Sequence, residues 1–180
     1  MKLNFEELGL PPRVRVAEIN YLIAAKAIVV RVHHQDTGCD WLYWRPIEGE
    51  PRYRLLLPQE PQHTILSYMP DPTGSWLYVL KFSCTSTVDG RGMGMDFEKL
   101  YEIEVREGAQ PVELVSKARM GRDWSCAILA AGNDPPALYC SVGRHEAPRP
   151  GGESMAYSVE RFDLKTRRIS PVCDLPGTFI

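Results

Sequence analysis

The sequence lacks the patterns that mark membrane, secreted or nucleic-acid-binding proteins. Its longest apolar stretch, residues 21–30, is interrupted by Lys26 and is too short to span a bilayer. The first residues include acids where a signal peptide needs a basic start and an apolar core. The net charge is −2, and no run of Lys and Arg could follow a phosphate backbone. These absences predict a cytoplasmic protein that binds neither nucleic acid nor membrane.

Patterns of reactive residues are missing as well. The five cysteines are widely spaced and form no CxxC pair. Without a secretion signal, this usage predicts reduced thiols rather than disulfides. There is no Gly-x-Ser-x-Gly elbow, and no Ser, His and Asp stand in a recognisable nucleophile context. We therefore expect no catalytic residues, no cofactor and no enzymatic activity.

Helix signals are scarce, whereas turn residues are plentiful. The best helix candidate, residues 4–10, has an Asn cap but is stopped by Gly9 and Pro11, which leaves one or two turns at most. The chain holds 15 prolines and 14 glycines, and the segments between them have the composition of short strands. A length of 180 residues suits one domain with a sizeable core. We expect an N-terminal extension over residues 1–13 and a single all-β domain over residues 14–177.

The predicted strands recur in register. LYWRPI (42–47), LYEIEV (100–105) and VERFDL (159–164) align without gaps and start 58 and 59 residues apart. Each is followed by a polar turn and another strand, and each is preceded by a pair of strands. The unit is therefore four strands, found three times, at about 14–58, 63–116 and 124–173. Such a unit and period are typical of β-propeller blades. Residues 176–180 have the pattern of a further strand's start.

One hairpin carries a family resemblance. PDPTGSWLYVLKF (70–82) resembles the Pro-Asp-x-x-Gly turn and following strand of TolB-like propellers, a group with PD-type, WD-like repeats. LYWRPIEGEPRYRLL (42–56) and YSVERFDLKTRRISPV (157–172) are similar to the next hairpin of that family. The resemblance covers nearly the whole of residues 14–177 and implies three four-stranded antiparallel blades. The alternative fold is a β-sandwich, which gives no reason for repeats in register.

Three blades do not close a ring, because propellers usually have about four to eight. The two terminal blades would leave apolar faces without a neighbour. Two copies could form a six-bladed ring about a two-fold axis, another protein chain could supply the missing blades, or the 180 residues could be a piece of a longer polypeptide. Cyclic dimers are the commonest symmetric assembly, so a homodimer is the default expectation.

Two insertions predict a binding surface. The aligned second and third strands start 14 residues apart in the first unit, but 23 and 21 apart in the other two. The inserted loops, 85–96 and 144–155, occupy equivalent positions, and equivalent loops emerge on one rim of a propeller. Met and Arg are common at protein interfaces, so we expect a protein-binding rim. Its predicted side chains are Arg91, Met93, Met95, Arg144, His145 and Arg149.

A weaker hypothesis concerns metal binding by HHQDTGCD (33–40). His33, His34, Asp36 and Cys39 are all competent metal ligands. Their spacing matches no established site, and neighbouring histidines on a strand should point to opposite faces. A polar hairpin loop is the interpretation that we favour.

The sequence thus predicts a non-enzymatic protein-interaction or scaffold module, built from a partial β-propeller. The alternative is the gating propeller, or a split subunit, of an enzyme that resembles prolyl oligopeptidase. A third hypothesis is a small-ligand or glycan binder that uses the central tunnel of the propeller.

Overall fold

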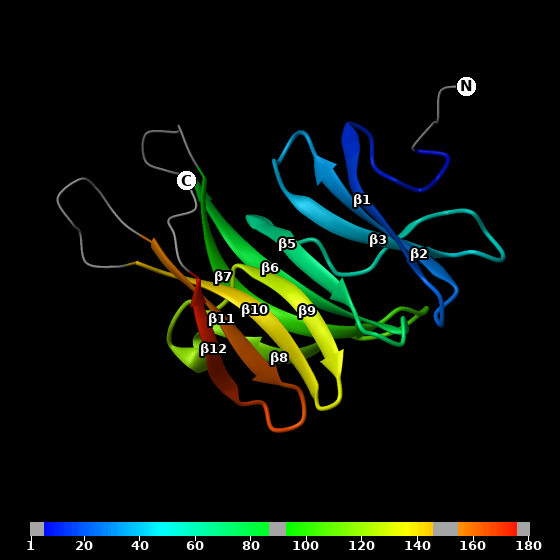
Figure 1. Cartoon of the computed structure of the whole chain (residues 1–180). Helices are drawn as coiled ribbons and strands as arrows, with labels where there is room; N and C mark the ends of the chain where they lie inside the picture. The colour runs from blue at the N-terminus through cyan, green and yellow to red at the C-terminus, as the bar shows by residue number, and fades with distance from the viewer. Residues whose placement is uncertain (1–5, 87–92, 146–154, 176–180) are drawn as a thin grey trace.

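A computed structural model describes residues 6–86, 93–145 and 155–175, and almost all regular structure in these ranges is β (Figure 1). The strands form three four-stranded antiparallel sheets, and each sheet keeps its strands in chain order. We call them sheet A (β1–β4), sheet B (β5–β8) and sheet C (β9–β12). The predictions of an all-β protein and of three four-stranded antiparallel units are confirmed.

The sheets follow the predicted repeat closely. Sheet A comprises β1 (Val14–Leu22), β2 (Ala27–His34), β3 (Asp40–Pro46) and β4 (Arg54–Leu55). Sheet B comprises β5 (His63–Pro70), β6 (Trp76–Ser86), β7 (Met93–Glu104) and β8 (Val112–Ser116). Sheet C comprises β9 (Ala127–Asn133), β10 (Pro136–His145), β11 (Met155–Asp163) and β12 (Ile169–Leu175).

β4 covers only two residues, Arg54–Leu55, although the first predicted unit extends to residue 58. Leu56 and Leu57 are consecutive and both buried, so the alternation of inward and outward side chains stops after Leu55. Pro58 then removes a backbone donor. The chain leaves sheet A here and crosses to the start of sheet B.

The turn between β5 and β6 shows how the sequence forms these hairpins. The Asp71 carboxylate accepts hydrogen bonds from the backbone N–H groups of Thr73, Ser75 and Trp76, at 2.9, 2.8 and 2.7 Å. Gly74 has φ of 76°, which a residue without a Cβ adopts at little cost. Its carbonyl accepts a hydrogen bond from the Ala25 N–H of the β1–β2 turn at 3.1 Å. The turn therefore also connects sheet B to sheet A.

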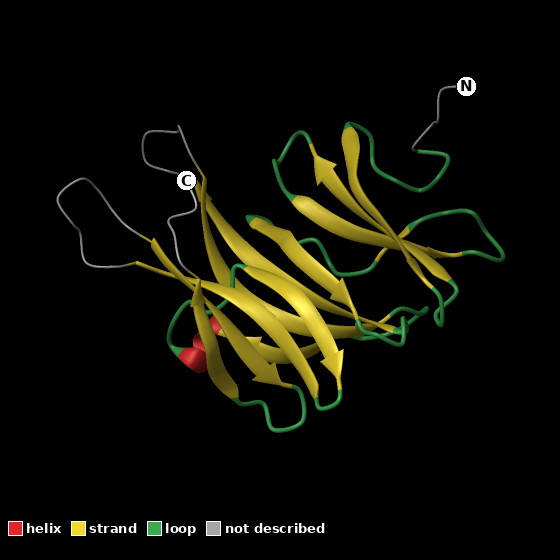
Figure 2. Ribbon diagram, viewed as in Figure 1, coloured by secondary structure: helices red, strands yellow, loops and turns green. Residues whose placement is uncertain are grey.

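Helical structure is limited to α1 (Lys117–Met120) in the described residues, drawn red in Figure 2. α1 was not predicted. It follows β8 and precedes β9 along the chain, and its C-cap is Gly121, which has φ of 67°. The described part of the helix expected over residues 4–10 is instead a turn, closed by a hydrogen bond from the Gly9 N–H to the Glu6 carbonyl at 3.0 Å. No helix in the described ranges is long and apolar enough to cross a membrane.

Two apolar cores hold the sheets together. The first lies mainly between sheets A and B and includes Leu42, Ile65 and Val79. The second joins sheets B and C and includes Leu80, Leu138 and Phe162. Sheet B is therefore the middle layer, as Figure 1 also shows, and sheets A and C each pack against it on one side.

Candidate functional site

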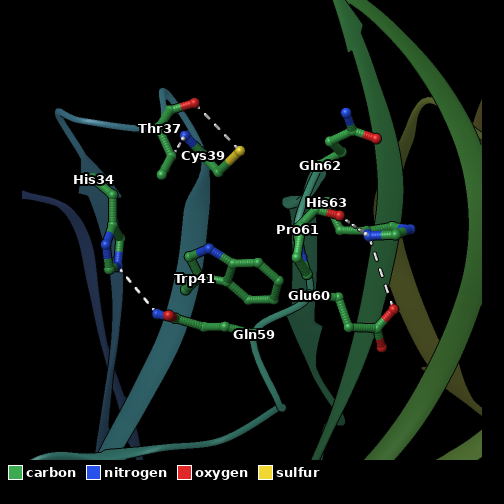
Figure 3. Close-up of a pocket in the computed structure, with 9 residues that line it drawn as sticks. All are labelled: His34, Thr37, Cys39, Trp41, Gln59, Glu60, Pro61, Gln62 and His63. Atoms are coloured by element: carbon green, nitrogen blue, oxygen red, sulfur yellow. Dashed lines mark hydrogen bonds and ion pairs between the residues drawn. The ribbon is translucent and has the colours of Figure 1, made fainter.

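A pocket of about 390 Å³ opens between sheets A and B. Its walls come from the β2–β3 turn with the start of β3, and from the segment that enters β5 (Figure 3). Figure 3 shows Trp41 between these two walls. The lining residues are His34, Thr37, Cys39, Trp41, Gln59, Glu60, Pro61, Gln62 and His63.

A charged cluster extends from this pocket into sheet B. The Lys81 ammonium is buried and lies 2.7 Å from the Glu60 carboxylate and 3.7 Å from that of Glu98. His63 Nδ1 lies 2.8 Å from the Pro61 carbonyl, which can only accept, so this nitrogen carries a proton. His63 Nε2 lies 2.6 Å from Glu98 Oε2. The His63 ring therefore lies between the Pro61 carbonyl and the Glu98 carboxylate.

Glu60, His63 and Glu98 are the group in the described residues whose donor atoms could hold a metal ion, since these atoms lie within 4.8 Å of one another. Lys81 opposes that use. Its ammonium already lies against both carboxylates, and its hydrogen bond holds the pKa of the Glu60 carboxyl below its ordinary value. The two acids, the lysine and the histidine form an ion-pair network that already engages the atoms a metal would need.

The residues of the sequence-based metal hypothesis do not converge. His33 Nδ1 lies 2.7 Å from the Asp40 carboxylate, whereas His34 stacks on Tyr43 with ring centroids 6.1 Å apart. Burial lowers the pKa of His34. Asp36 pairs with Arg13 at the surface, and Cys39 is buried. The described residues therefore give no support to a metal bound by His33, His34, Asp36 and Cys39.

The predicted rim is described in part. Met95 is 47% exposed, and the Arg144 guanidinium pairs with the buried carboxylate of Glu160. Met93 is the first residue of β7 and His145 the last of β10. Arg91 and Arg149 lie outside the described residues.

A second pocket, of about 110 Å³, repeats the position of the first. It opens between sheets B and C and is lined by Met95 and Phe97 of β7 and by the segment 123–126 that enters β9. Met95 thus lies beside a junction between two sheets. This is the position that Cys39 and Trp41 occupy at the junction of sheets A and B.

The outer face of sheet A carries exposed apolar side chains on its first strand. Ile19 and Tyr21 of β1 are 65% and 58% exposed. Asn20, between them, points the other way and donates a hydrogen bond to the Tyr68 hydroxyl of sheet B. Leu22, the residue after Tyr21, is buried. Because side chains alternate along a strand, Ile19 and Tyr21 are on the face turned away from sheet B.

Sheet C shows the same arrangement on its first strand, β9. Ile128 is buried, and its N–H donates to the Ser67 hydroxyl of sheet B at 3.2 Å. The next residue, Leu129, is 49% exposed and therefore faces away from sheet B. By contrast, β5, the first strand of the middle sheet, has no exposed residue. The sequence does not signal this difference, because apolar residues occur along all three strands and only packing decides which faces are covered.

Comparisons with known proteins give no further assignment: no protein-family model, curated protein or solved structure matches this chain.

Proposed function

We propose that this chain is a protein-interaction module: half of a six-bladed, TolB-like β-propeller that is completed by a second copy. The observation that carries the proposal is the contrast among the three first strands. β5 has no exposed residue, whereas β1 exposes Ile19 and Tyr21 and β9 exposes Leu129. A soluble protein that leaves apolar side chains on two opposite faces gains stability when both are covered.

The existing junctions suggest how closure would occur. β5 of sheet B lies against β9 of sheet C, so these two sheets meet through their first strands, whereas sheet A meets β5 mainly through β3. In a two-fold dimer, β9 of one copy would lie against β1 of the other, and the contact would occur twice. Each copy offers one face of each kind, so the assembly closes without leaving a free face.

The proposed ring also gives the rim its role. The β6–β7 and β10–β11 hairpins correspond to the β2–β3 hairpin in their sheets, and each junction already carries a pocket at this end. Met95 is the described rim residue that is both apolar and exposed. A second protein would bind over Met95 and its neighbours, since a flexible thioether adapts to a partner surface.

Charge placed on either outer face should break the assembly. The unmodified chain is expected to have twice its 20.4 kDa mass in solution by multi-angle light scattering. Tyr21→Lys and Leu129→Lys should each give a 20.4 kDa monomer, because each buries a charge in both contacts of the ring. Both positions are exposed in the single chain, so the monomer should keep its circular dichroism spectrum.

Val112→Lys is the matched control. Val112 is 45% exposed, but it belongs to β8, the last strand of the middle sheet. This variant should remain a dimer. A dimer of unchanged stability in both Tyr21→Lys and Leu129→Lys would disprove the proposed contact.

A further inference from the structure

Two of the five thiols meet across the junction of sheets A and B. Cys39 immediately precedes β3 of sheet A, and Cys84 is in β6 of sheet B. Both side chains are buried in the same apolar core, and the Cys39 thiol is near enough to Cys84 to help raise the pKa of the Cys84 thiol. They are 45 positions apart in the sequence, so the fold and not local chain geometry brings them together.

Backbone contacts fix this arrangement independently of the sulfur atoms. The N–H of Asp40, next to Cys39, donates to the Thr64 hydroxyl at 2.8 Å. The N–H of Cys84 donates to the Gln62 carbonyl at 2.6 Å. Gln62 and Thr64 flank one residue at the start of β5, so both cysteines are anchored to the same short segment.

The other cysteines have different surroundings. Cys126 accepts a hydrogen bond from the Gly143 N–H at 3.2 Å. Cys140 is fully buried near Ser125. Cys173 is exposed on β12, the last strand of sheet C. These three thiols are internal controls for reactivity at Cys39 and Cys84.

The pair has a route to solvent. Cys39 lines the pocket of about 390 Å³, together with Gln62, the residue that anchors Cys84. Figure 3 shows the Cys39 sulfur turned toward the space between the two walls of the pocket. A volume of this size admits a molecule as small as a hydroperoxide.

We propose that Cys39 and Cys84 are a redox modification site, at which hydrogen peroxide converts the two thiols into an intramolecular disulfide that joins sheets A and B. The Cys39 thiolate attacks the peroxide; an S–O bond forms, the O–O bond breaks, and hydroxide leaves and is protonated to water. The Cys84 thiolate then attacks the sulfenic sulfur of Cys39; the S–S bond forms, the S–O bond breaks, and a second water results. The thiols lose two electrons and two protons, and one peroxide becomes two waters.

We expect this disulfide to form slowly. Burial, together with the neighbouring Cys39, raises the pKa of the Cys84 thiol to about 11. The thiolate is the reactive form, so little of Cys84 can react at neutral pH. Oxidation should therefore need sustained exposure to the peroxide. Once formed, the bond would close a long loop and hold the two sheets together.

The test uses the full chain, folded, at pH 8.5 with hydrogen peroxide. Free thiols are then alkylated, and the protein is digested and analysed by mass spectrometry without reduction. We expect a linked peptide that joins Cys39 to Cys84, lighter by two hydrogen masses and released by a thiol reductant. Cys126, Cys140 and Cys173 should remain in unlinked peptides. The oxidised protein should melt roughly 5–15 °C higher than the reduced one.

Two variants and one control make the result decisive. Cys39→Ser and Cys84→Ser should each abolish the linked peptide, whereas Cys140→Ser should keep it. Repeating the oxidation in guanidinium should give mixed linkages, because the fold no longer selects the pair. The proposal is overturned if folded wild-type protein gives no link between Cys39 and Cys84, or if the link joins other cysteines.

Discussion

At the scale of single residues, a few buried polar groups determine the local structure. Asp71 is the clearest case, because its carboxylate collects three backbone N–H groups and the Thr73 hydroxyl within one turn. Burial by itself would raise the pKa of Asp71, but these hydrogen bonds outweigh it and lower the pKa below the ordinary value of 3.8. The acidic residue of the Pro-Asp-x-x-Gly motif is thus the acceptor on which the turn depends.

Replacing Asp71 should destabilise the protein in a pH-dependent way. Asp71→Asn keeps one acceptor oxygen but places an NH₂ group against other donors, so we expect a loss of about 1–3 kcal/mol at pH 7 by urea unfolding. A lowered pKa in the folded state contributes stability above the unfolded-state value and loses it as the pH falls through the folded-state value. The difference between wild type and variant should therefore shrink below about pH 4.

The control for this prediction is Asp134→Asn, since Asp134 is the exposed aspartate in the corresponding turn of sheet C. It should change stability by less than about 0.5 kcal/mol. Equal losses for Asp71→Asn and Asp134→Asn would show that the hydrogen bonds of Asp71 do not stabilise the turn.

Trp124 provides a hydrogen-bond donor to a second buried acid, Glu160. Its indole N–H donates to the Glu160 carboxylate at 2.8 Å, and its ring packs against Phe97 and Phe162, with centroids 5.6 and 5.7 Å away. Trp124→Phe keeps an aromatic ring but removes the donor, so it should cost about 1–3 kcal/mol in thermal or urea unfolding. Trp76→Phe, at a partly exposed position, should cost clearly less; the reverse order would contradict this role for the indole N–H.

At the scale of elements, the strands and turns are well predicted by the sequence because they depend on short-range patterns. Short apolar runs bounded by turn residues mark strands such as β2 and β6, and the Pro-Asp-x-x-Gly pattern marks the β5–β6 turn. α1 could not be predicted in the same way, since four residues are too few to show a helical period. The ion-pair cluster of Glu60, Lys81 and Glu98 also escaped prediction, because the fold brings its members together from different segments.

The N-terminal segment belongs to the packing of sheet A. Leu10 is buried in the first core, and the Tyr53 N–H donates to the Leu8 carbonyl at 2.7 Å. Gly9 makes this contact possible: its φ is 77°, and a Cβ there would lie 2.7 Å from the Tyr53 carbonyl oxygen. The segment from residue 6 to the start of β1 is therefore held against the loop before β4.

Gly9→Ala should therefore lower the free energy of unfolding more than a glycine-to-alanine change at a position where the new Cβ meets no other atom. Gly108 has a similar φ of 71°, but a Cβ there would meet nothing within 4 Å. We expect Gly108→Ala to cost about 1 kcal/mol from backbone strain alone, and Gly9→Ala about 2–4 kcal/mol. Urea unfolding of both variants measures the difference. Equal losses would mean that the segment can move away from Tyr53 without cost.

At the scale of the whole molecule, the proposed function depends on the two outer faces. Sheets A and C each pack against sheet B, and their first strands expose apolar side chains on the opposite side. In the proposed ring of two copies, the outer face of sheet A in one copy would meet the outer face of sheet C in the other. The same ring would bring the equivalent hairpins of six sheets to one rim, where a partner protein could bind.

The most direct test is the solution mass of the unmodified chain, measured by native mass spectrometry over a range of concentrations. The proposal predicts a dimer, at twice the 20.4 kDa of the chain, that persists at low micromolar concentration. It also predicts that each copy buries the faces around Tyr21 and Leu129, which hydrogen exchange on the same sample can detect. A stable 20.4 kDa monomer at all concentrations, with rapid exchange along β1 and β9, would contradict it.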